Sequence, residues 1–196
     1  MRLDTDEDVI DRLAGIAPGS PLDQVRRQRA EARRHAQASF EALFRPLDET
    51  AMGLRERAAV ALFVAALHGD AAAADFYAGL LEQCGGAALA APVRAAAAQA
   101  AGRGPHGRYP AGPLSCEDVP EALQAVADAA LGPRLAAALA HARMLVFHPR
   151  DAGPDHLEAL VQAHWSTPGI VTLSQLVAFL SFQIRAVAGF RAMQAA

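Results

Sequence analysis

One corner of the chain carries side chains that could perform acid–base chemistry. His68, Gly69 and Asp70 follow a strongly apolar stretch and precede an Ala-rich one. An imidazole beside a carboxylate can accept and return a proton near neutral pH, which is the basis of general acid–base catalysis. A structural interpretation is also open, in which His68 caps the end of one helix and Asp70 caps the start of the next.

Other patterns that accompany known chemistries are absent or stand in the wrong context. Gly102–Gly107 reads GRGPHG, but a dinucleotide-binding glycine motif lies between a strand and a helix, and this one follows an Ala-rich helical stretch. The seven histidines include no HExxH pair, and Cys84 and Cys116 lie 32 residues apart without zinc-binding spacing. No GxSxG sequence supports a serine hydrolase. The sequence therefore predicts no cofactor and no metal ion.

The composition predicts an all-α protein around this corner. Hydrophobic residues make up 53% of the 196 residues, and much of that fraction is alanine, the best helix former. Apolar periodicity, caps and breakers predict these helices: Asp6–Ile16, Ser20–Phe44, Leu54–Leu67, Ala71–Cys84, Ala87–Ala101, Glu117–Leu131, Gly132–Phe147, Pro154–His164 and Thr167–Met193. The Pro- and Gly-rich segment Gly102–Ser115 is predicted as a long loop, and such loops are often functional.

Charge and polarity narrow the classes of partner. The net charge is −3 and all 18 basic residues are Arg, which excludes a generally nucleic-acid-binding surface and indicates a GC-rich, bacterial genome. A basic run in the second predicted helix is interpreted as a solvated face or an inter-subunit contact; it comprises Arg26, Arg27, Arg29, Arg33 and Arg34. The acidic N-terminus contains no signal segment, and polar residues interrupt Ile170–Phe190. We therefore expect a cytoplasmic protein without a membrane span.

The two most apolar helices share a short pattern. Val64–His68 reads VAALH and Val177–Ser181 reads VAFLS, and in this alignment Tyr77 falls opposite Phe190. The match predicts an internal helical pseudo-repeat around a shared core.

The order of these elements resembles a known superfamily. An apolar helix, a small corner and an Ala-rich helix are followed by Arg134–Phe147, Trp165-Ser166 and the run LVAFLSFQIRAVAGF. This pattern is similar to the carboxymuconolactone decarboxylase superfamily, in particular its alkylhydroperoxidase D-like, peroxidase-related branch of CMD domain proteins. The resemblance covers about residues 35–193. It implies a single all-helical domain over residues 1–196, with an N-terminal extension of about residues 1–34.

The same resemblance implies an alkylhydroperoxidase D-like helix bundle that assembles as a homo-oligomer, either a dimer, a trimer or a hexamer. Active members carry a Glu, a CxxC pair and a His, with which they reduce peroxides. In the register that places His68-Gly69-Asp70 on the family's corner, the cysteine pair falls on Asp70 and Ala73, the His on Tyr77 and the Glu on Ala58. A register shifted by two residues recovers Glu56 but again supplies no thiol. We therefore expect no thiol peroxidase activity.

Three functional hypotheses remain at this stage. The first is a catalytically divergent or degenerate member of the superfamily. The second is a non-redox enzyme, as in the cysteine-free decarboxylase branch, with His68, Asp70 and Tyr77 as candidate catalytic residues acting on a small organic molecule. The third is a helical scaffold or interaction protein whose contact face is the Arg-rich helix. Whether the protein is an enzyme is left open.

Overall fold

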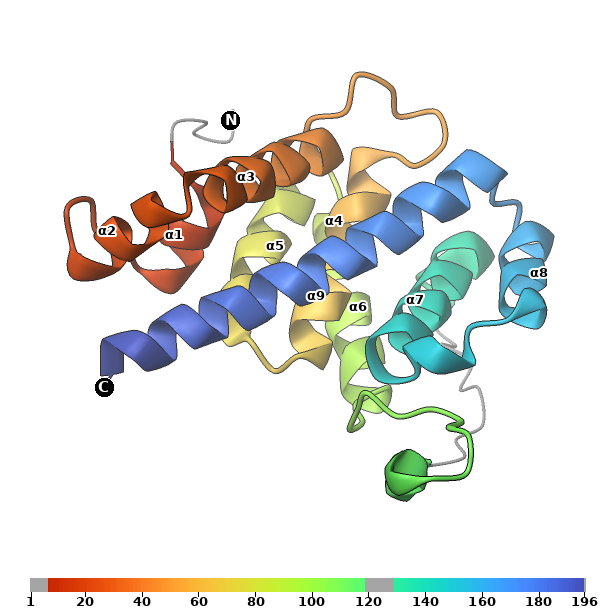
Figure 1. The fold of residues 1–196 in the computed structure, drawn as a ribbon. Helices are drawn as coiled ribbons and strands as arrows, with labels where there is room; N and C mark the ends of the chain where they lie inside the picture. Colours follow the sequence, from red (N-terminus) through yellow and green to blue (C-terminus); the bar gives the residue numbers. More distant parts are fainter. Residues whose placement is uncertain (1–6, 119–128, 196) are drawn as a thin grey trace.

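The computed structural model of the chain describes residues 7–118 and 129–195, and the regular elements of these residues are all helices, with no strand (Figure 1). The predicted all-α class is therefore confirmed for the described part of the chain. Its α-helices are α1 (Val9–Ala14), α2 (Pro21–Gln28), α3 (Ala30–Phe44), α4 (Leu54–Leu67), α5 (Ala71–Gln83), α6 (Ala87–Gln99), α7 (Gly132–Phe147), α8 (Pro154–Gln162) and α9 (Thr167–Ala195). Two short 3₁₀ helices, Pro113–Glu117 and Pro149–Asp151, complete the set.

Helix α4 lies at the centre of the molecule. Every residue from Ala58 to Ala65 is fully buried, because α4 is apolar all round and packs against α5, α6, α7 and α9. Its first turn is closed by Glu56, whose carboxylate accepts a hydrogen bond from the Gly53 N–H at 3.1 Å. The apolar stretch around which we expected the fold to form is thus the core helix.

The corner after α4 is a tight turn between two capped helices. Gly69 has φ +70°, a left-handed conformation that glycine adopts without a steric penalty. Asp70 then starts α5 as its N-cap, since its side chain accepts a hydrogen bond from the Ala73 N–H at 3.0 Å. Both helix boundaries agree with the sequence-based prediction.

The N-terminal region differs from the prediction. The helix expected over Ser20–Phe44 is broken at Arg29, which has φ −113° and ψ 51°, so α2 and α3 are separate. The break lets Arg26 and Arg33, from different helices, both reach Asp11 in α1. The basic run is therefore not simply a solvated face, because Arg26 is buried in an ion-pair network.

Helix α9 crosses the whole molecule, with α3 along one side and α7 along the other (Figure 1). By length and composition it could cross a membrane, a property that core helices share. Its inner face packs on α4, with Leu173, Leu176 and Leu180 fully buried. Its outer face is exposed, as at Val171, Phe182 and Gly189.

The segment between α6 and α7 is only partly a loop. A 3₁₀ helix at Pro113–Glu117 begins inside the predicted loop Gly102–Ser115, while residues 102–112 are irregular as expected. The N–H of His106 donates a hydrogen bond to the carbonyl of Phe147 at 2.6 Å, which ties this segment to the end of α7. The helix predicted for Glu117–Leu131 lies largely outside the described residues.

Candidate functional site

The three candidate catalytic residues are each engaged in local contacts. Nδ1 of His68 donates a hydrogen bond to the carbonyl of Val64 at 2.9 Å, because a carbonyl can only accept. This leaves Nε2 as an acceptor, and that atom is buried without a partner. Burial lowers the pKa of His68 below its ordinary value, and the nearby Arg185 charge acts in the same direction. His68 therefore favours its neutral form.

Asp70 is held by two partners. Besides capping α5, its carboxylate accepts a hydrogen bond from Nη1 of Arg191 at 2.7 Å. The other terminal nitrogen of Arg191 donates to the carbonyl of Leu13 at 2.7 Å, so the ion pair connects the corner to α1. Asp70 therefore caps α5 and links the corner to α9, and its carboxylate is oriented toward Arg191.

Tyr77 is fully buried beneath α9. Its hydroxyl donates a hydrogen bond to Oε1 of Gln183, which is also fully buried, and its ring stacks on Phe44 at a centroid distance of 5.4 Å. Burial raises the pKa of Tyr77 well above its ordinary value. Neither of the two grooves described below is lined by His68, Asp70 or Tyr77. Their catalytic role stays a prediction.

Neither cysteine lies at the corner where the superfamily's redox pair would stand. Cys84 follows α5 and is half-buried, while Cys116 is exposed in the first 3₁₀ helix. Burial, together with the charge of Glu49, raises the pKa of the Cys84 thiol. A raised pKa reduces the thiolate fraction, which is the form that attacks peroxides. Within the described residues, no three His, Cys, Asp or Glu side chains are grouped to hold a metal ion.

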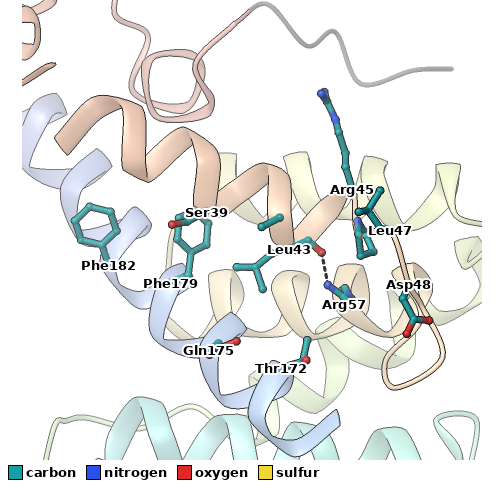
Figure 2. Close-up of a pocket in the computed structure, with 12 residues that line it drawn as sticks. Ser39, Leu43, Arg45, Leu47, Asp48, Arg57, Thr172, Gln175, Phe179 and Phe182 are labelled. Atoms are coloured by element: carbon teal, nitrogen blue, oxygen red, sulfur yellow. Dashed lines mark hydrogen bonds between the residues drawn. The ribbon is translucent and has the colours of Figure 1, made fainter. Parts of the chain in front are cut away.

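An open groove of about 870 Å³ lies between α3, α9 and the segment 45–48 (Figure 2). Its apolar walls come from both helices, and Arg57 of the core helix α4 forms its floor. We call it the Arg57 groove; it is lined by Ser39, Ala42, Leu43, Arg45, Pro46, Leu47, Asp48, Arg57, Thr172, Gln175, Phe179 and Phe182. Its volume is in the range of pockets that bind small molecules.

Arg57 is a buried cation without a paired carboxylate in the described part of the chain. Its side chain is 5% exposed. Nε donates to the carbonyl of Met52 at 2.9 Å and Nη1 to that of Leu43 at 2.8 Å, the latter drawn in Figure 2. These bonds use two of the five N–H groups of a guanidinium. Burial lowers the pKa of Arg57 from its ordinary value, but an arginine stays charged in a protein.

The groove combines this cation with apolar walls and a single carboxylate. Leu43 is buried, Phe179 is half-buried and Phe182 is 53% exposed, so aromatic surface faces the opening. Asp48 at the rim accepts hydrogen bonds from the N–H and the hydroxyl of Thr50, at 2.8 and 2.9 Å. The hydrogen bond from the Thr50 N–H lowers the pKa of Asp48, which keeps the rim carboxylate charged.

A second groove, of about 770 Å³, lies on the other side of α9 against the end of α7. Ser174 lines it, and its hydroxyl lies 3.1 Å from Nε2 of His141, a buried residue of α7. Burial, with a smaller contribution from the charge of His156, lowers the pKa of His141 to about 4. In this Ser–His contact His141 is a poor general base at neutral pH, because its pKa of about 4 lies far below that pH.

Sequence reasoning missed Arg57, although a signal was present. The predicted helix Leu54–Leu67 is strongly apolar, and Arg57 stands within it. A charged residue in a helix without a polar face must find partners in the interior. This requirement indicated that Arg57 would have partners in the interior. The sequence pattern could not show that Leu43 and Phe179 would line a groove beside it.

Comparison of the chain with models of protein families, with curated proteins and with solved structures finds no match. The functional interpretation therefore rests on the geometry of the described residues.

Proposed function

We propose that this protein binds a small amphipathic monoanion, an organic carboxylate with an apolar tail, in the Arg57 groove. The observation that carries the proposal is the buried guanidinium of Arg57, which has N–H groups to spare and no carboxylate paired with it in the described chain. A buried charge is costly unless it is paired, and arginine pairs with carboxylates through two parallel hydrogen bonds. The ligand's carboxylate would supply that pairing.

The rest of the groove selects the ligand's other properties. Leu43, Phe179 and Phe182 offer apolar surface for a tail, and burial of such surface contributes roughly 25 cal/mol per Å². Asp48 at the rim repels a second negative charge, so a monoanion is favoured over a dianion. The proposed ligand class is therefore a medium-chain or aryl monocarboxylate.

We further propose that the chain is a thiol-independent, divergent relative of the alkylhydroperoxidase D-like proteins, with a helical pseudo-repeat spanning α4 and α9. Its all-helical fold and the capped corner between α4 and α5 are compatible with this relation. The positions of Cys84 and Cys116, away from the corner, speak against peroxidase chemistry of the family type. The function is thus ligand binding without a redox thiol.

An alternative is acid–base catalysis at the corner. One observation favours it: Nε2 of His68 is buried, unpartnered and able to accept a proton. Against it stands Asp70, whose carboxylate is directed toward Arg191 and the start of α5. The binding proposal is preferred because its charged group lines an open groove.

Isothermal titration calorimetry with octanoate tests the binding proposal. In Ala42→Trp, an exposed alanine on the groove wall is replaced by a side chain that fills the groove. We expect octanoate affinity to fall by about tenfold or more, equivalent to about 1.4 kcal/mol. The matched control is Ala32→Trp, an exposed position on the same helix away from the groove, which should leave affinity unchanged. Equal affinities in the wild type and both variants would contradict the site.

A further inference from the structure

We infer that the second groove, between α9 and the end of α7, is a separate binding site for an ω-hydroxy carboxylate, an apolar chain with a carboxylate at one end and a hydroxyl at the other. We call it the Ser174 groove, and the side chains that carry the inference are those of Ser174, Ser181 and Arg185. The inference does not depend on the ligand proposed for the Arg57 groove, because Phe182 is the one lining residue that the two grooves share.

The polar side chains that line the Ser174 groove all come from α9. The opposite wall is formed by Leu145 and Val146 of α7 and by two prolines, Pro105 and Pro149, which have no N–H to donate. Among the described residues that line the groove, none is an aspartate or a glutamate. The groove therefore offers a ligand apolar contact along its length and side-chain hydrogen bonds along one side, and it does not repel an anion.

The two serines of the groove have hydrogen-bonding capacity left for a ligand. A hydroxyl on a helix often donates to the carbonyl four residues earlier, as Thr172 does to Pro168 at 2.9 Å. Ser174 instead contacts His141, and Ser181 has no side-chain hydrogen bond within the described chain. Both serines are half-buried, so a ligand that bonds to them is partly shielded from water.

The contact with His141 makes Ser174 a partner for a hydroxyl. His141 is neutral near pH 7, so its Nε2, which lies 3.1 Å from the Ser174 oxygen, either donates or accepts. If Nε2 donates, the Ser174 hydroxyl is left to donate to a ligand; if Nε2 accepts, the Ser174 oxygen is left to accept. A ligand hydroxyl satisfies either arrangement, because it is both a donor and an acceptor.

Arg185 provides the partner for a carboxylate at the other end. It lies one helical turn after Ser181, so both side chains can bond to the same carboxylate. Arg185 is exposed and has no hydrogen bond or ion pair in the described part of the chain. Ser174 precedes Ser181 by two turns, or about 10 Å, with Val177 and Ala178 between them. An extended chain of about ten carbons joins the two ends over this distance.

Calorimetric titration with 10-hydroxydecanoate and decanoate tests the site. The titrations use Ala42→Trp, in which the Arg57 groove is filled, so that the result does not depend on that groove. An apolar groove alone would favour decanoate, because burial of an unpaired hydroxyl is costly. We instead expect 10-hydroxydecanoate to bind at one site per chain, about fivefold or more tighter than decanoate. No binding, equal affinities or tighter binding of decanoate would overturn the inference.

Substitutions in the same background test the two ends of the groove. Ser174→Ala should lower the affinity for 10-hydroxydecanoate to that for decanoate and leave decanoate unchanged, so decanoate also reports that the variant is folded. Arg185→Gln should weaken both ligands by about tenfold, since it removes the charged partner of the carboxylate. The matched control is Arg55→Gln, an exposed arginine of α4 that does not line the groove, and it should change neither affinity. A Ser174→Ala variant that keeps the preference, or an Arg185→Gln variant that keeps full affinity, would overturn the inference.

Nuclear magnetic resonance of the His68 ring gives a second readout at the carboxylate end. Burial lowers the pKa of His68, and the charge of Arg185 lowers it further. A carboxylate bound to Arg185 offsets that charge, so we expect saturation with 10-hydroxydecanoate to raise the pKa of His68. The rise should be absent in Arg185→Gln. An unchanged pKa of His68 in the saturated protein would place the carboxylate away from Arg185 and overturn the inference.

Discussion

Tyr77 and Gln183 form the most deeply buried polar pair described in the structure. The Tyr77 hydroxyl is the partner of Gln183 Oε1, and Nε2 of Gln183 has none. Tyr77→Phe would leave the whole amide of Gln183 unpartnered in the core. We expect the free energy of unfolding, measured by urea denaturation, to fall by about 1–3 kcal/mol.

The second substitution of this pair is the control. Gln183→Met has a similar length and no hydrogen-bonding requirement, so adding it to Tyr77→Phe should recover most of the lost stability. Recovery would assign Tyr77 a structural role in place of the catalytic one considered from the sequence. A double variant no more stable than Tyr77→Phe would contradict this explanation.

His141 should make stability depend on pH. Its pKa of about 4 in the folded state lies below the value of 6.5 expected for the unfolded chain. Between these values the unfolded chain binds a proton that the folded chain does not, so acidification favours unfolding. We expect the free energy of unfolding to decrease by up to about 1.4 kcal/mol per pH unit from this group as pH falls from 6.5 to 4.

The variant His141→Gln isolates this contribution. Glutamine can still reach a hydroxyl partner but does not titrate, so the slope of stability against pH between 6.5 and 4 should be shallower than in the wild type. Identical slopes would show that His141 is protonated in the folded state over this range.

At the scale of the residue, the sequence predicted the features that depend only on neighbouring residues along the chain. The sequence offered Asp70 as a helix N-cap and the structure confirms it, because a cap needs only the next three residues. Arg57 and Gln183 were not singled out, because their environments are made by α3 and α5, far away in sequence.

An ion-pair network holds the N-terminal helices α1, α2 and α3 together. Few features of the local sequence predict it. Arg26 donates to Asp8 at 2.8 Å and to Asp11, and Arg33 donates to Asp11 and, at 2.9 Å, to Asp23. The hydrogen bond from the Gly19 N–H, with those from the arginines, lowers the pKa of Asp23 to about 2. This network requires α2 and α3 to be separate helices, which is why the predicted continuous helix was wrong.

Arg26 and Arg27, two adjacent arginines of α2, should differ sharply in their contribution to the free energy of unfolding. Arg26→Leu removes a 6%-exposed cation from Asp8 and Asp11, which then keep only Arg33, so we expect the free energy of unfolding to fall by about 3 kcal/mol. Arg27→Leu removes an exposed cation from Asp23, which keeps other partners, and should cost about 1 kcal/mol or less. Similar effects in urea denaturation would show that the network is not what joins α1 to α2.

Apart from this break, the helices of the described residues were predictable as elements. Pro, Gly and cap residues stand at the boundaries of α4, α5 and α7, so their limits followed from sequence alone. What could not be predicted is how they cross. The Arg57 groove depends on α3 and α9 packing against α4 with a gap between them, and no local pattern contains that spacing.

At the scale of the molecule, α9 divides the surface into two apolar grooves. One opens toward α3 with Arg57 beneath it, and the other opens toward α7 with Ser174 at its wall. Phe182 borders both, at the crest between them.

The central claim, that the Arg57 groove binds an amphipathic monoanion, is tested most directly by comparing two ligands of equal chain length and opposite charge. Calorimetric titration of the wild-type protein with octanoate and with octylammonium keeps the tail constant and changes only the headgroup. We predict that octanoate binds at one site per chain and at least about tenfold more tightly than octylammonium. Equal affinities, or tighter binding of octylammonium, would contradict the claim.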